Sequence, residues 1–246
     1  MFNRHNNLLR AEKDLIFPLR CLITGPCGTG KTTVGVFIML QMKLWYDRLI
    51  IVCPGFRKQE MFRLLDEFVK PTDIYENPKP GTFKAINEDI EIVTEFCKKQ
   101  GKQPLRTLVF VDDLAGLHVI HGGRFSDFAH FCIGCRHMDA SIIVISQQPT
   151  AVSPAFRDNV NAVIAFPSRR SQDVEWLLKE YKGLQMDKDE MKMTILKAWK
   201  GKVKKEEEND DSIGNNFLFI ALDPRKQEAQ FFSGFDYSVT PKRVKQ

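Results

Sequence analysis

A short glycine-rich segment near the start of the chain has the residue types and spacing for phosphate chemistry. The segment ITGPCGTGKTT (residues 23–33) fits the pattern G-x-x-x-x-G-K-[ST], with Gly25, Gly30, Lys31 and Thr32 at the fixed positions. Such glycines let backbone N–H groups point at phosphate oxygens, the lysine reaches the β- and γ-phosphates, and the hydroxyl sits on Mg²⁺. We therefore predict that the loop binds ATP with Mg²⁺. The predicted nucleotide-binding residues are Gly25, Pro26, Cys27, Gly28, Thr29, Gly30, Lys31, Thr32 and Thr33.

The residues around this loop predict the structure that it requires. Residues 18–24 form a short apolar run typical of a buried strand, and residues 32–45 read as a helix that is apolar nearly all round. A helix placed there would direct its N-terminal dipole at the phosphates. The alternative, a glycine-rich turn that happens to contain a lysine, does not account for a strand before the loop and a helix after it.

A pair of carboxylates follows a second buried run. The segment TLVFVDDL ends in Asp112 and Asp113, and a strand of a parallel sheet would deliver both to its carboxyl edge. We predict that Asp112 holds Mg²⁺ and that Asp113 orients or activates the attacking water as a general base. The alternative is an Asp-Asp turn at the end of a strand, which is common.

A third group of polar residues surrounds the run SIIVIS. Arg136 precedes this run, Gln147 and Gln148 end it, and Arg157 follows before the next apolar run. An amide at the tip of a strand would read whether the γ-phosphate is present, and an arginine ahead of the strand would reach another subunit's nucleotide.

Taken in order, these motifs resemble the FtsK–HerA superfamily of DNA-pumping ATPases. In length and in the residues of its motifs, the chain is most similar to the single-domain DNA-packaging ATPases of double-stranded DNA viruses and virophages, the poxvirus type. The resemblance covers roughly residues 18–180. The resemblance implies that Arg136 is an arginine finger and that Gln147 or Gln148 is the sensor, a choice that stays open. The family usually has Asp-Glu in the second motif, whereas this chain has Asp112-Asp113.

Apolar runs alternate with helical patterns along the chain and predict the fold. Strands are expected at 48–54, 106–114, 141–149 and 161–167, and helices at 58–69, 86–100, 173–181 and 188–200. Continuous apolar strands are typical of a parallel sheet with helices on both faces. We predict a three-layer α/β P-loop NTPase, RecA-like and of the additional-strand type, with a mostly parallel central sheet.

The last part of the chain has a different character. A charged stretch at 201–215 reads as a solvated loop, and residues 217–235 read as a hairpin at the sheet edge with its turn at Pro224–Lys226. We expect one ATPase domain over residues 1–246, with a core of about 18–180 and a C-terminal part at 181–246.

Composition limits the class of protein. The chain has 36 Lys+Arg and 31 Asp+Glu, a net charge of +5 that permits nucleic-acid binding without requiring it. No apolar run approaches the ~20 residues of a membrane span, and the first residues lack the apolar centre of a secretion signal. The segment HFCIGCRH (residues 130–137) offers metal-ligating side chains, but a single C-x-x-C favours packing over zinc.

The function expected from these features is ATP-driven translocation of double-stranded DNA into a viral capsid. A single ATPase domain would form a homo-oligomeric ring, a hexamer or a pentamer, with capsid vertex proteins as further partners and the host cytoplasm (viral factory) or the virion as its location. The alternatives are a nucleoside or nucleotide kinase, a ring helicase and a non-enzymatic NTP switch. The sequence leaves open whether Arg157, Arg169 or Arg170 contacts DNA or a neighbouring subunit.

Overall fold

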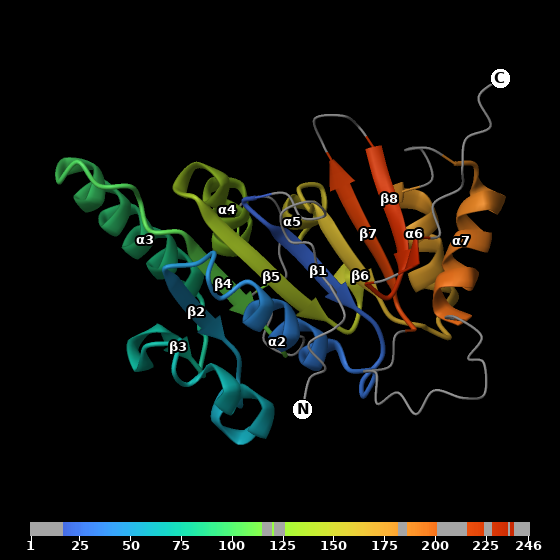
Figure 1. Cartoon of the computed structure of the whole chain (residues 1–246), viewed down its shortest axis with the longest axis horizontal. Helices are drawn as coiled ribbons and strands as arrows, with labels where there is room; N and C mark the ends of the chain where they lie inside the picture. Colours follow the sequence, from blue (N-terminus) through green and yellow to red (C-terminus); the bar gives the residue numbers. More distant parts are fainter. Residues whose placement is uncertain are drawn as a thin grey trace.

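A single mixed sheet forms the centre of the computed structural model, which describes residues 17–114, 120, 126–181, 186–200, 216–223, 228–235 and 237–238 (Figure 1). Within these residues the sheet has nine strands in the order β3-β2-β4-β5-β1-β6-β7-β8-β9. The strands are β1 (Arg20–Thr24), β2 (Arg48–Val52), β3 (Ile74–Tyr75), β4 (Thr107–Val111), β5 (Ala140–Ser146), β6 (Ala162–Ala165), β7 (Leu218–Asp223), β8 (Glu228–Ser233) and β9 (Tyr237–Ser238).

The first six strands are parallel, and the remaining strands pair antiparallel at the far side of β6. Strand β5 lies between β1, which leads into the glycine-rich loop, and β4, which ends before the carboxylate pair. The predicted additional strand and the mostly parallel sheet are therefore confirmed. The predicted C-terminal hairpin is also present as β7 and β8, although its turn at Pro224–Lys226 lies outside the described residues.

Helices cover both faces of the sheet because successive strand residues point to opposite sides. Ile50 and Val109 belong to the core on one face, under α3, α4, α6 and α7, whereas Ile51 and Phe110 belong to the core under α2. The α-helices are α2 (Lys31–Gln41), α3 (Thr82–Lys99), α4 (Asp127–Gly134), α5 (Pro154–Arg157), α6 (Ser171–Tyr181) and α7 (Lys188–Lys200). The three-layer prediction is confirmed.

The predicted helix at 58–69 is wrong. The structure has two 3-10 turns there, η1 (Phe56–Lys58) and η2 (Glu60–Leu65), separated by Gln59 in an extended conformation. Phe62 and Leu65 are buried, three residues apart as a 3-10 turn requires, and the Phe62 ring stacks on Phe56 at 4.8 Å. Packing of these rings therefore determines the local structure in place of the helical period, which would have buried Leu64 and Phe68.

Several short elements were not predicted. They are η3 (Pro71–Asp73), β3, α4, η4 (Cys135–Met138), η5 (Pro149–Ala151), α5 and β9. Strand β3 has two residues inside a stretch rich in Pro, Asn and Gly, a composition typical of a loop. The charged stretch at 201–215 lies outside the described residues.

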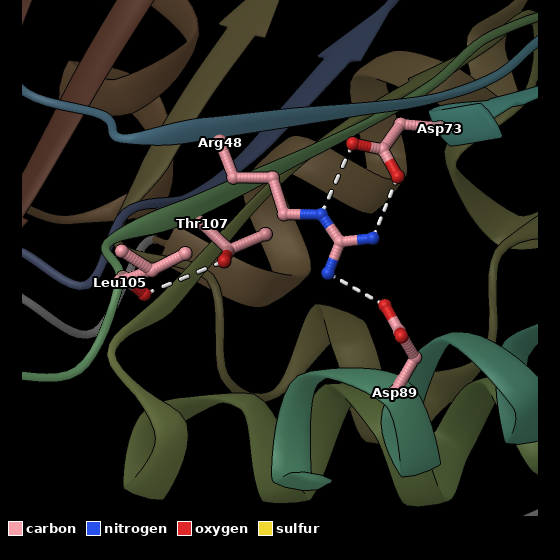
Figure 2. Close-up of polar contacts among 5 residues, drawn as sticks. All are labelled: Arg48, Asp73, Asp89, Leu105 and Thr107. Atoms are coloured by element: carbon pink, nitrogen blue, oxygen red, sulfur yellow. Dashed lines mark hydrogen bonds and ion pairs between the residues drawn. The ribbon is translucent and has the colours of Figure 1, made fainter. Parts of the chain in front are cut away.

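A partly buried ion-pair cluster connects the outer strands to neighbouring elements (Figure 2). The Arg48 guanidinium, at the start of β2, donates to Asp73 through Nε at 3.1 Å and Nη2 at 2.6 Å, and its Nη1 lies 2.5 Å from Asp89 Oδ2. Because these carboxylates come from η3 and α3, Arg48 ties β2 to the element before β3 and to the helix after it. The pKa of Arg48 is raised, mainly by its hydrogen bonds to Asp73.

Candidate nucleotide-binding site

The glycine-rich loop lies at the carboxyl edge of the sheet, between two parallel neighbours. Thr24, the last residue of β1, pairs with Ser146 of β5 and Ala165 of β6. Gly25 follows at a φ of 150°, and a Cβ there would lie 2.6 Å from Phe166 Cβ, so only glycine fits. Gly30 adopts the left-handed conformation (φ 89°) directly before α2 begins at Lys31. The predicted strand, loop and helix are thus in place.

Lys31 and Thr32 are the residues of the loop with side chains oriented for phosphate and metal chemistry. Lys31 Nζ donates to the carbonyl oxygen of Pro26 at 2.6 Å, which places the ammonium over the loop. Thr32 Oγ1 donates to Asp112 Oδ2 at 2.8 Å and so joins the loop to the end of β4. Two oxygen atoms that could bind a hard metal ion, one from each motif, therefore lie side by side.

Burial controls the protonation of this site. Asp112 is 4% exposed, and desolvation raises the pKa of its carboxyl to about 6, against the opposing hydrogen bonds from Thr32 and from the backbone of Asp113. Burial also lowers the pKa of Lys31, and Asp112 has the largest opposing effect. Each charge is thus stabilised by the other and destabilised by the loss of water.

Asp113 has an unusual backbone conformation. Its φ of 57° lies in the left-handed region, which non-glycine residues seldom adopt and aspartate tolerates better than most. Strand β4 ends at Val111, two residues earlier, and the turn that follows separates the two carboxylates: Asp112 is buried and Asp113 is exposed. Backbone strain of this kind is concentrated at functional sites.

A cleft of about 400 Å³ brings most of the predicted residues together. Gln147 lines it, whereas Gln148 does not and has its carbonyl and N–H engaged by the Ser146 hydroxyl. Gln59 and Met61, at the 3-10 turns, also line it and were not predicted. The described lining residues are Cys27, Gly28, Gly30, Lys31, Thr32, Thr33, Gln59, Met61, Asp112, Asp113, Ile145, Ser146 and Gln147.

Arg136 lies at the opposite edge of the sheet. It belongs to η4, before Ala140, and Ala140 pairs with Thr107, the first residue of β4. Strand β5 has seven residues, so at ~3.3 Å per residue its length separates η4 from the phosphate loop by about 20 Å. An arginine side chain is shorter than this distance. The structure therefore does not bring Arg136 to the cleft of its own chain.

The other arginines singled out from the sequence also lie outside the cleft lining. Arg157 donates through Nε to the Val152 carbonyl at 3.1 Å and forms an ion pair with Glu180 at 3.3 Å. Arg169 and Arg170 are exposed and follow β6, at the same edge as the phosphate loop.

The two cysteines of HFCIGCRH are packed as predicted. Cys132 and Cys135 are fully buried in the core under α4, and the Cys135 thiol donates to the Cys132 carbonyl at 3.2 Å. His130 and His137 are exposed and do not share this interior. No described helix has the length and apolar character needed to cross a membrane.

Comparison with known proteins identifies the family. The family model described as "Poxvirus A32 protein" matches residues 5–218. Among curated protein sequences, none matches the chain.

Solved structures share the fold. The genome packaging NTPase B204 from Sulfolobus turreted icosahedral virus 2, in complex with AMP, aligns with a TM-score of 0.58 at 13% identity, over 88% of this chain and 98% of that one. The same NTPase with ATP-gammaS aligns with a TM-score of 0.53 at 14% identity, over 86% and 95%. The DNA-packaging ATPase B204 from Sulfolobus turreted icosahedral virus aligns with a TM-score of 0.52 at 13% identity, over 86% and 95%. At such identities the likeness shows the fold, and with the family match it confirms the predicted relationship.

Proposed function

The chain belongs to the Poxvirus A32 protein family, and on that premise we propose that it is an ATP-driven translocase that packages double-stranded DNA into a viral capsid. The active form is a homo-oligomeric ring, a hexamer or a pentamer, that works at a capsid vertex in the host cytoplasm. The family and the fold of the B204 packaging ATPases support a genome-packaging ATPase, and the residues of the cleft support its chemistry.

The cleft has the donors that Mg²⁺-ATP requires. Thr32 Oγ1 and Asp112 Oδ2 are 2.8 Å apart, and hydroxyl and carboxylate oxygens are ligands that Mg²⁺ prefers, so these two residues would hold it. The bound ion would neutralise charge on the β- and γ-phosphates. Lys31 would exchange its bond to the Pro26 carbonyl for a phosphate oxygen. Asp113, exposed at the mouth, would orient the attacking water, and Gln147 would sense the γ-phosphate.

The observation that carries the proposal is the small number of basic side chains in the described part of the cleft. Lys31 is the single basic side chain among the described residues that line it. Phosphoryl transfer gains ~10³ to 10⁵ in rate from an arginine at the transferring group. Because η4 lies about 20 Å away across the sheet, Arg136 would serve the next subunit's cleft, and a head-to-tail ring supplies that arrangement.

Basic residues at the carboxyl edge of the sheet, where the glycine-rich loop lies, would contact the DNA. Arg169 and Arg170 are exposed after β6, and Lys197 and Lys200 are exposed in the last turns of α7. A packaging motor must grip any sequence, so its contacts would be to phosphates, and log affinity would fall with log salt at about −0.9 per phosphate. ATPase turnover with and without long duplex DNA across a salt series tests this part of the proposal.

A mixing experiment tests the shared site. Lys31→Ala and Arg136→Ala should each abolish turnover alone, whereas mixed rings contain interfaces with an intact Lys31 on one side and an intact Arg136 on the other. Partial recovery that depends on protein concentration is the expected result. Arg106→Ala is the matched control, because Arg106 lies at the same edge and pairs with Asp47, and it should keep full turnover.

Two results would contradict the proposal. No recovery, in samples where light scattering shows mixed rings, would exclude an arginine that acts on a neighbour. Full-rate hydrolysis by a monomer, without stimulation by DNA, would exclude the motor.

A further inference from the structure

Helix α3 carries an apolar stripe on its outer face. Ile92 is 67% exposed and Phe96, one turn later, is 62% exposed. At 3.6 residues per turn, Glu88 and Glu95 lie within about 60° of Ile92 on one side of this α3 stripe, with Lys99 at about 20° on the same side. Glu88 already lies 3.9 Å from Lys84, so Glu95 is the glutamate left to pair across an interface. The helix projects past the neighbouring strands at one end of the molecule (Figure 1). A helix that exposes two large apolar side chains one turn apart can dock this apolar face into a hydrophobic groove of another protein.

A groove of matching size lies on the other face of the sheet, between α2 and η2. Its volume is about 220 Å³, larger than the ~150 Å³ cavity that accommodates a benzene ring. We call it the α2 groove, with Met39, Leu40, Lys43, Leu65 and Phe68 among its lining residues. Leu44 and Leu64, each next in sequence to a lining residue, are also exposed.

The charges of the α2 groove complement those of the α3 stripe. Lys43 Nζ lies 5.1 Å above the centre of the Phe68 ring. Asp47 and Arg48, which also line the groove, already pair with Arg106 and Asp73. Among the described charged residues that line the groove, Lys43 is therefore the one that forms no ion pair. A glutamate beside Ile92 or Phe96 would supply its partner.

Both features connect to the shared nucleotide site. Helix α3 packs on η4, the turn that contains Arg136, so the stripe and this turn belong to one side of the chain. Element η2 contributes Met61 to the nucleotide cleft and Leu65 to the α2 groove, so both lie on the α2 face of the sheet, the cleft at the carboxyl edge and the groove at the edge where β2 and β4 begin. The stripe and the groove lie over opposite faces of the sheet, so they are two different patches of one chain, and a head-to-tail interface joins two different patches.

We infer that adjacent subunits associate by seating the α3 stripe of one copy in the α2 groove of the next. The inference rests on the proposed ring and specifies the surfaces that form it. Docking of this kind places the face of one subunit that carries α3 and η4 against the face of its neighbour that carries α2 and η2.

The test uses two single substitutions of the full chain, Phe96→Asp in the stripe and Phe68→Asp in the groove. Both side chains are substantially exposed, at 62% and 42%, so thermal unfolding should match the wild type. Each variant alone should remain a monomer of 28.4 kDa in analytical ultracentrifugation with ATP, at concentrations where the wild type assembles. An equal mixture should form dimers and stop there, because each pair has one intact stripe and one intact groove.

Controls and alternative results separate this inference from the proposed function. Met193→Asp, an equal change at a 53% exposed residue of α7, should leave the ring intact. Rings that survive both substitutions would refute the docking surfaces and leave the motor standing. Loss of assembly in Phe96→Asp but not in Phe68→Asp would refute the groove and indicate stripe-to-stripe packing. A wild type that stays monomeric with ATP and DNA would refute both the docking and the ring.

Discussion

Replacing Asp112 by asparagine is expected to stabilise the nucleotide-free protein above pH 6 while it abolishes Mg²⁺-dependent nucleotide binding. The carboxyl is buried, and desolvation raises its pKa from 3.8 to about 6. The folded state therefore holds this proton more tightly than the unfolded state does. Stability from this group is fully present below pH ~4 and is lost as the pH rises through about 6.

The magnitude follows from the size of the shift. A rise of about two pKa units, at ~1.4 kcal/mol per unit, makes the charged carboxylate cost about 3 kcal/mol of folding free energy at pH 8. An asparagine keeps an oxygen that accepts from the Thr32 hydroxyl and carries no charge to desolvate. We expect Asp112→Asn to gain about 1–3 kcal/mol at pH 8 and to gain little at pH 4.

Urea unfolding followed by tryptophan fluorescence measures this difference, in EDTA, at several pH values from 4 to 8. Asp47→Asn is the control of opposite sign, because Arg106 lowers the pKa of Asp47 and the substitution should cost at most about 1 kcal/mol at pH 7. Saturating Mg²⁺-ATP at 100 times its Kd should add about 2.7 kcal/mol to the wild type and nothing to Asp112→Asn.

The reasoning would be refuted by an Asp112→Asn protein that is less stable than the wild type at pH 8 in EDTA. A gain of the same size at pH 4 and pH 8 would also refute it, because that gain would not come from ionisation.

Four further substitutions test individual roles. Asp113→Asn keeps a residue that tolerates a φ of 57°, so it should bind Mg²⁺-ATP normally and lose hydrolysis, as single-turnover assays and nucleotide titration will show. Gln147→Ala should slow turnover while Gln148→Ala does not, because only Gln147 lines the cleft; equal turnover in both variants would contradict the sensor assignment. Gly35→Ala should destabilise the fold by about 1–3 kcal/mol in urea unfolding, since a Cβ there would lie 2.8 Å from the Phe110 ring, and a neutral effect would show that α2 can shift.

The strands were predictable because parallel strands with helices on both faces must be apolar throughout. The apolar runs that form β1, β2, β4, β5 and β6 are short and flanked by turn residues, and these two features together distinguish them from helices. The segment at 58–69 shows the limit of this reasoning. Its apolar residues fit a helical period, but stacking of Phe56 on Phe62 and the contact of Phe62 with Phe110 determine the outcome. Such contacts depend on the fold as a whole.

The site was predictable where a motif fixes spacing and unpredictable where the fold alone supplies the residue. Lys31, Thr32 and Asp112 meet because both motifs follow parallel strands and so reach the same edge. Gln59 and Met61 reach the cleft through the 3-10 turns after β2, and no pattern in the chain indicates this. Gln147 and Gln148 both follow the same strand, and only the fold shows that Gln147 lines the cleft whereas Gln148 does not.

Strand β5 has a consequence for the timing of the proposed motor. Its first residue, Ala140, follows the turn that contains Arg136, and its last, Ser146, precedes Gln147 in the chain's own cleft. In a ring with a shared site, this one strand would join two consecutive nucleotides, the one that a subunit holds and the one that it helps its neighbour to hydrolyse. Any shift of β5 with phosphate release would then bias the adjacent site, and by thermodynamic reciprocity the adjacent site would bias β5. The nucleotide states of adjacent subunits would therefore be correlated rather than independent.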